Sequence, residues 1–400
     1  MPIAGQWEPV RGEASAVGGG GTHRPDLCQT QGVVDWARFG ADMEDIAIRG
    51  LTEAKRVSSA LRPMTIRPYR GFVAHGVAHV RGRVLEQPVI ESAGEGLRVD
   101  AMIWANLMRW VVFDMPRVEV TVTVGDSAVT ATSDANGFVT AKVPVGDLAP
   151  GWHSVTFEAR DEDEDRTVTA HGRVVQPDPK SQIAVISDID DTILRTGMTE
   201  GLTALRRTML RDAHGRKPVS GTPSFYRGLA RGLGSRSEST FFYVSASPWN
   251  LYDMLVQWLQ LRGFPRGPLF LTDWKPGPKE AGGGKENPGH KRARIRRLLD
   301  SYPELSFVLV GDSGEHDPEI YDSFLQSDPD RIATALIRDV APGSKRSLHL
   351  RERGLINLLE NKRESLLCDD VEQMARVAQS LGLIDELTIE EVHIELRGGY

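Results

Sequence analysis

The sequence predicts an α/β fold in which a Rossmann-like parallel sheet is preceded by a small β-sandwich-like domain and an N-terminal helix. In the second half of the chain, short continuous apolar runs are separated by helix-like stretches, a pattern typical of strands buried on both faces. Between residues 63 and 176, apolar and polar residues alternate instead, as they do in half-buried strands. Residues 176–180 separate the two patterns, and their two prolines in polar surroundings indicate a linker.

The first 62 residues precede both domains. Residues 1–32 contain four consecutive glycines and no apolar periodicity, so we expect a disordered tail. In residues 33–62 apolar side chains recur every three to four positions, which predicts a helix whose end is marked by Pro63.

The predicted β-rich domain covers residues 63–176. Valines alternate with polar residues over 118–124, and a second alternation covers 155–159. Asn136-Gly137 lies between two such runs and predicts a hairpin turn, because both residues tolerate positive φ. Short strands with regular turns favour a small sandwich. The apolar stretch 97–112 interrupts the alternation and is expected to form an inserted helix.

The predicted parallel-sheet domain covers residues 181–345, and residues 346–400 are expected to form C-terminal helices and a tail. One clear helix is predicted at 369–381, with an acidic start and Gly382 after its end. The apolar runs assigned to strands are 183–186, 241–244, 269–271, 307–310 and 333–337.

Composition excludes several classes of protein. The net charge of −7 gives no basic excess for nucleic acid. The two cysteines, Cys28 and Cys368, lie far apart and suit a reducing compartment. No apolar run approaches the roughly 18 residues of a membrane span. The first residues lack the pattern of a signal peptide, so we expect a cytoplasmic protein.

The most informative segment follows the apolar run 183–187. Asp188, Asp190 and Asp191 are three carboxylates within four residues, and clustered negative charge is costly directly after a buried strand. A bound cation would remove much of that cost, and Mg²⁺ prefers carboxylate oxygens. The alternative is an ordinary polar loop after a strand.

A second run, 307–310, also ends on carboxylates, at Asp312 and Asp317. In an open α/β sheet ligands gather at the carboxyl ends of strands, so this end and the Asp188 end are expected to face one crevice. Alternatively, Asp312 caps the helix that follows.

Two further signals bear on phosphate. Ser245 and Ser247 follow the run 241–244, and a hydroxyl there can donate to a phosphoryl oxygen or simply cap a helix. Lys291 begins a basic segment and can neutralise a phosphoryl group, although most such lysines lie on a solvated helix face.

In their order along the chain, which is Asp188 to Thr192, Ser245, Lys291 and Asp312, the four motifs resemble those of the haloacid-dehalogenase-like phosphohydrolases. The likeness covers about residues 183–317 and implies a sheet of the haloacid-dehalogenase type. The segments 188–193, 245–252, 263–268 and 311–321 further resemble the phosphatidate phosphatases typified by the yeast actin patch protein. The β-rich region resembles, more loosely, the N-terminal part of bacterial members.

This resemblance implies a role for each residue. Asp188 would attack phosphorus and form an aspartyl-phosphate, and Asp190 would act as general acid and then general base. Mg²⁺ would be held by Asp188, Asp312 and the main-chain carbonyl of Asp190. Ser245 and Lys291 would bind the transferring phosphoryl oxygens.

Other residues are given supporting or competing parts. Thr192 and Asp317 would support the loop around the metal. Ser247 competes with Ser245, which we favour because it directly follows the strand. The basic stretch 195–227 is too short for a large cap domain, so an open site would admit a membrane lipid and its arginines could meet anionic headgroups. A solvated basic helix is the alternative.

Three functions follow from these residues. The leading one is a Mg²⁺-dependent phosphatase that converts phosphatidate to diacylglycerol, with peripheral membrane contact and no nucleic-acid partner. The second keeps the chemistry and acts on a soluble phosphate ester or a phosphoprotein. The third is a lipid- or cytoskeleton-binding module with a vestigial site, and the complete set of Asp188, Asp190, Lys291 and Asp312 argues against it.

Overall fold

The computed structural model of the protein describes most of the chain after residue 62. All described residues belong to one compact unit, Ala60–Tyr400. The predicted tail 1–32, the helix 33–62, the inserted helix 97–112 and most of the basic stretch 195–227 lie outside the described residues. The described ranges are 63–86, 113–162, 164–181, 183–194, 217–232, 238–273, 288–360 and 362–398.

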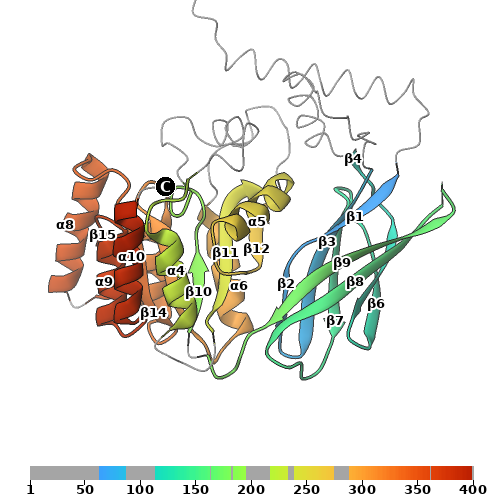
Figure 1. Ribbon diagram of the computed structural model, residues 1–400, viewed down its shortest axis with the longest axis horizontal. Coiled ribbons are helices and arrows are strands. Elements are labelled where there is room, and N and C mark those ends of the chain that lie inside the picture. Colours follow the sequence, from blue (N-terminus) through green and yellow to red (C-terminus); the bar gives the residue numbers. More distant parts are fainter. Residues whose placement is uncertain are drawn as a thin grey trace, which may run out of the picture. The chain divides into compact units, whose positions relative to one another are not determined.

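The second half of the unit is built on a six-stranded sheet in the order β12-β11-β10-β13-β14-β15 (Figure 1). Every neighbouring pair is parallel, which confirms the predicted parallel sheet. The strands are β10 (Ile183–Ser187), β11 (Thr240–Pro248), β12 (Leu269–Thr272), β13 (Ser306–Asp312), β14 (Ile332–Arg338) and β15 (Leu366–Cys368).

Helices cover both faces of this sheet, which explains why its strands are continuously apolar. Val185 of β10 belongs to one buried cluster, whereas its neighbours Ala184 and Ile186 belong to the cluster on the other face. The first face is covered by α4 (Thr222–Arg231), α5 (Tyr252–Leu261), α9 (Val371–Ser380) and α10 (Glu386–Gly398). The second is covered by α6 (Pro288–Ser301) and α7 (Asp317–Ser327), while α8 (Lys345–Leu359) contacts β15.

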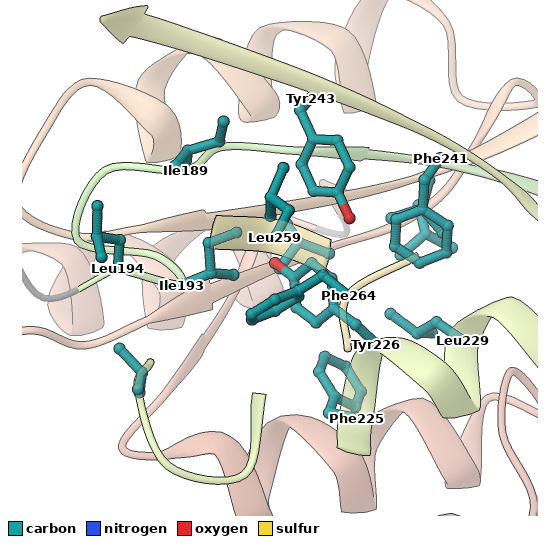
Figure 2. Close-up of a cluster of buried hydrophobic side chains, with 14 of the residues drawn as sticks. Ile189, Ile193, Leu194, Phe225, Tyr226, Leu229, Phe241, Tyr243, Leu259 and Phe264 are labelled. Atoms are coloured by element: carbon teal, nitrogen blue, oxygen red, sulfur yellow. The ribbon is translucent and has the colours of Figure 1, made fainter. Parts of the chain in front are cut away.

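Aromatic side chains fill the first cluster. Figure 2 shows Phe225 and Tyr226 of α4 beside Phe264, with Phe241 of β11 nearby. The Tyr226 and Phe264 rings meet edge to face with centroids 5.3 Å apart, an arrangement that aromatic pairs favour. This packing fixes α4 under the strand ends that carry the polar residues described below.

The helix predicted at 369–381 is confirmed as α9. The Asp370 side chain accepts a hydrogen bond from the Gln373 amide at 2.8 Å and caps the helix. Gly382 follows with φ of 70°, the left-handed conformation that ends many helices. No helix within the described ranges is long and apolar enough to cross a membrane.

The first half of the unit is a nine-stranded sheet that is antiparallel except between β2 and β9. Burial alternates along β5, as its sequence predicts. The long strand β3 pairs with β1, β2, β4 and β7. The strands are β1 (Met64–Pro68), β2 (Gly71–Ala74), β3 (Val77–Glu86), β4 (Phe113–Asp114), β5 (Glu119–Val124), β6 (Ser127–Thr132), β7 (Phe138–Pro144), β8 (Gly151–Asp161) and β9 (Arg166–Gln176).

The predicted hairpin at Asn136-Gly137 is wrong in its pairing. A turn is present, since the Gly137 amide donates to the Asp134 carbonyl at 2.9 Å and Gly137 has φ of 73°. However, β6 pairs with β5, whereas β7 pairs with β3. The turn therefore connects two strands that do not pair with each other. Asn-Gly favours a sharp reversal of the chain but does not determine which strand the next one pairs with.

Strand β2 and its flanking residues pack against the parallel-sheet half of the same unit. Phe72 belongs to the cluster that contains Phe242 and Tyr302, and the Tyr302 hydroxyl donates to the Val73 carbonyl at 2.8 Å. Tyr69 lies in the other cluster, with its ring centroid 4.5 Å from that of Trp249. Contacts of this half therefore reach both faces of the parallel sheet.

Candidate active site

The candidate site begins at the carboxyl end of β10. Asp188 follows the strand, is 1% exposed, and its amide donates to the Val310 carbonyl of β13 at 2.9 Å. The chain then turns sharply: Asp191 has φ of 51°, and the Thr192 amide donates to the Asp190 carbonyl at 2.6 Å. Non-glycine residues rarely adopt this conformation, and such strain is concentrated at functional loops.

Lys291, in the first turn of α6, enters the site as a buried cation. Its ammonium donates to Asp188 Oδ1 at 3.0 Å and forms a short contact with Asp317 Oδ1. Glu315 Oε2 lies 3.6 Å away. Lys291 is 2% exposed, so it is not the solvated surface lysine of the alternative interpretation. A buried ammonium needs such partners because it has lost its hydration.

Three carboxylates converge on one point. Oxygens of Asp188, Asp312 and Asp317 lie within 4.8 Å of one another, and all three side chains are buried. Asp188 Oδ2 is buried with no hydrogen-bond partner among the described residues. Nearly all buried polar atoms in proteins form a hydrogen bond, so this unpaired oxygen is an exception. Oxygen ligands of this number and charge suit Mg²⁺, so these residues fit a divalent cation.

Asp317 is held in this group by the shape of the chain at Gly311. A Cβ at position 311 would lie 2.2 Å from Asp317 Oδ2 and 2.8 Å from its Cβ. Only glycine leaves room for that carboxylate, which also lies 3.4 Å from the Asp312 amide. Sequence reasoning placed Asp317 in a supporting role, whereas its oxygens lie in the acidic group itself.

Ser245 and Ser247 lie within β11, which continues past the predicted run 241–244, so Ser245 does not follow the strand as predicted. Both serines contact Asp190, the second aspartate of the first motif. The Ser245 hydroxyl donates to Asp190 Oδ2 at 2.6 Å, and the Ser247 hydroxyl donates to the same oxygen at 3.1 Å. The Ser247 amide also donates to Ser245 Oγ at 2.9 Å. Ser245 and Ser247 therefore both line the site, and neither acts as a simple helix cap.

Burial raises the pKa of three carboxyl groups at the site, those of Asp188, Asp190 and Asp312. The pKa of Asp188 is raised well above its usual range by burial, although Lys291 opposes the effect. Burial also raises the pKa of Asp190 against the hydrogen bonds from Ser245 and Ser247. Burial and the Asp317 charge raise the pKa of Asp312 to about 7. The site thus favours either protons or a cation at neutral pH.

The second layer of polar contacts includes residues that sequence reasoning missed. The Ser187 hydroxyl is 2.7 Å from that of Tyr226 and donates to the Asp188 carbonyl at 2.6 Å. Asp339, which is 2% exposed, accepts a hydrogen bond from Ser313 at 3.2 Å. Asp339 follows β14 as Asp188 follows β10, so its place after an apolar run was a usable signal.

The remaining predicted residues take clear positions. The Thr192 hydroxyl donates to Asp312 Oδ2 at 3.2 Å, which links the first and last motifs. Trp249 and Tyr252 are each 5% exposed and belong to the core. Lys217, near the end of the basic stretch, is exposed, and the arginines between 195 and 216 lie outside the described residues.

Known proteins resemble this part of the chain. Residues 183–339 match the family described as phosphatidate phosphatase APP1, catalytic domain. Phosphatidate phosphatase APP1 of Saccharomyces cerevisiae is 34% identical over 157 residues, which are 39% of this chain and 26% of that protein. An uncharacterized protein of Schizosaccharomyces pombe is 27% identical over 183 residues, 44% of this chain and 28% of its own.

The chain therefore spans about a quarter of the length of these relatives. Among solved structures, a β-glucuronidase of Parabacteroides merdae aligns over 76% of this chain and 39% of that one, at 10% identity. Its TM-score of 0.25 is too low to assign a fold.

Proposed function

We propose, from the match of residues 183–339 to the phosphatidate phosphatase APP1 catalytic domain, that the chain is a Mg²⁺-dependent phosphatase acting on phosphatidate. The observation that carries the proposal is the convergence of Asp188, Lys291 and Asp312 at the carboxyl end of one sheet. Such sheet ends are where α/β proteins bind their ligands. The parallel-sheet domain is proposed to have the haloacid-dehalogenase type of fold. The β-rich domain is proposed to be sandwich-like.

The nucleophile in this proposal is Asp188. One of its carboxylate oxygens forms a bond to phosphorus while the bond from phosphorus to the substrate alkoxide breaks, which leaves an aspartyl-phosphate. Lys291 holds Oδ1 of the same carboxylate at 3.0 Å and so fixes its direction. The ammonium also offsets negative charge that develops on the phosphoryl oxygens.

Asp190 is proposed as the general acid and base. Its raised pKa favours the protonated form that gives a proton to the leaving alkoxide. In the second step Asp190 takes a proton from water, whose oxygen attacks phosphorus and releases Asp188 and inorganic phosphate. Ser245 and Ser247 contact Asp190 and would exchange that contact for phosphoryl oxygens when substrate binds.

The metal would be held by Asp188, Asp312 and the main-chain carbonyl of Asp190. Asp317, whose oxygens lie in the same acidic group, would lie beside it. When bound, Mg²⁺ would supply positive charge to the transferring phosphoryl group. The protein is proposed to be cytoplasmic and to meet the membrane only peripherally, since its substrate would be a lipid headgroup.

The test is phosphate release from micellar phosphatidate, lysophosphatidate and water-soluble phosphate esters, each with Mg²⁺ and after EDTA treatment. We expect Mg²⁺-dependent release that is fastest with phosphatidate. Fast turnover of soluble esters alone would assign the second function, and turnover unchanged by exhaustive EDTA treatment would refute the metal.

A further inference from the structure

A cavity of about 240 Å³ lies outside the candidate active site, within the same compact unit. One wall comes from β2, β3 and β7, and the other from β12 and α6. Phe72 and Trp249 contribute apolar surface, and Asp188, Asp190, Lys291 and Asp312 are not among its lining residues.

The lining of this cavity is strongly basic although the chain as a whole carries a net charge of −7. Among the described residues that line it, Asp273 is the only one with a carboxylate, and it forms an ion pair with Arg81 at 3.1 Å. The cavity also contains His79, whose pKa is lowered to about 4 by burial and by Arg297, so His79 is neutral at pH 7. The permanent cations that line the cavity are Arg70, Arg81, Lys142, Arg294 and Arg297.

Aromatic and imidazole rings hold the two best-placed arginines. The Arg81 guanidinium lies 3.9 Å from the centroid of Phe138 and 4.7 Å from that of Trp249. The Arg297 guanidinium lies 5.5 Å from the Phe72 centroid, and its Nη2 is 3.3 Å from His79 Nδ1. These contacts orient the arginines before any ligand arrives, which lowers the entropic cost of binding.

The cations are also incompletely satisfied by the protein. Arg81 Nε is buried and has no hydrogen-bond partner among the described residues. Burial and the Arg81 charge lower the pKa of both Arg294 and Arg297, which means that these charges repel one another in the structure. An anion in the cavity would relieve the repulsion between these charges.

From this juxtaposition we propose that the cavity is a second binding site, for a small phosphate-bearing anion. Guanidinium groups match the spacing of phosphate oxygens and bind them in pairs, and here Arg81 and Arg297 approach from opposite walls. A volume of about 240 Å³ is large enough for a phosphate group or a small headgroup. The site does not depend on the catalytic function proposed above.

The site lies beside the catalytic strand end along the chain. Asp273 directly follows β12, and the Thr272 hydroxyl at the end of β12 donates to the Ala246 carbonyl at 2.7 Å. Ala246 lies between the two serines of the active site. The second anion would thus bind next to the strand ends that position the first.

The test measures the dissociation constant of inorganic phosphate by equilibrium dialysis at fixed ionic strength for matched variants. Arg297→Gln should weaken binding at the cavity by roughly tenfold or more, since a charge-assisted hydrogen bond is lost. Lys142→Gln, on the exposed face of β7, should weaken it by a smaller factor. Arg292→Gln removes the same charge from an exposed position of α6 outside the cavity and should bind as the wild type does.

A second arm distinguishes the source of the phosphate. Vesicles of phosphatidylcholine with and without phosphatidate are floated with each variant, and loss of flotation confined to the cavity variants assigns a lipid headgroup. Loss of inorganic phosphate binding alone assigns a free phosphate, and either result supports the site. Wild-type behaviour of both Arg297→Gln and Lys142→Gln in both arms would overturn the proposal. Should Arg297→Gln fail to fold, Lys142→Gln decides.

Discussion

Gly311→Ala should disable the candidate site without removing any of its polar atoms. The added Cβ would lie 2.2 Å from Asp317 Oδ2, whereas real Cβ atoms essentially never approach a neighbour within 3.0 Å. Asp317 must therefore move by about 1 Å, and it would carry with it the contact to Lys291. Displacement of that size in a catalytic site costs about 10²-fold in rate. Overpacking should also lower the free energy of unfolding by about 1–3 kcal/mol.

The assay is single-turnover hydrolysis of an aryl phosphate in saturating Mg²⁺, with the unfolding temperature measured on the same preparation. Gly398→Ala is the matched control, because a Cβ at that position would meet nothing within 4 Å. We expect the control to retain wild-type turnover. Gly311→Ala with wild-type turnover and a folded structure would show that Asp317 need not occupy its present position.

Three further predictions concern the acids and the membrane. Asp190→Asn should lose roughly 10²- to 10⁴-fold in single-turnover rate on an alkyl ester but less on an aryl ester, whose leaving group needs no proton. Asp188→Asn should abolish turnover of both esters. Equal losses on the two esters for Asp190→Asn would refute its role as general acid. The pKa of Asp312 in the folded state is raised to about 7. The contribution of its protonation to the free energy of unfolding is therefore complete below the unfolded-state pKa and is lost as the pH rises through 7. In EDTA the urea concentration at the unfolding midpoint should therefore decrease as the pH rises from 5 to 8, and Mg²⁺ should restore it most at pH 8. Asp312→Asn should make both the pH dependence and the Mg²⁺ effect smaller. An unchanged pH dependence in that variant would assign the effect to another group. Sedimentation with anionic vesicles should decrease at high salt if contact is peripheral, and binding indifferent to salt would contradict that picture.

The sequence predicted those parts of the fold that follow from local pattern. The apolar run of β10 places Val185 and Ile186 on opposite faces, and only a strand covered on both sides requires that. The pairing of β7 with β3 was not predictable in this way. It depends on packing between segments far apart in the chain, whereas Gly137 specifies only a local reversal.

The residues of the candidate site likewise fall into those that local sequence pattern predicts and those that depend on contacts between distant segments. The sequence identified four residues that end or follow an apolar run, a position that can be recognised for each strand separately. They are Asp188, Asp190, Ser245 and Asp312. Their neighbours depend instead on strand order. Because β10 lies between β11 and β13, residues after β10 meet serines from one side and carboxylates from the other.

Residues whose role depends on close approach could not be found from pattern alone. Gly311 matters through a missing Cβ beside Asp317, and Tyr226 through a hydroxyl that reaches Ser187 from another element. The same holds for Arg81 and Arg297, which join one cavity only because β3 packs beside α6. Sequence pattern thus identifies residues that could carry chemistry, and the sheet order and its packing determine which of them act on the same ligand.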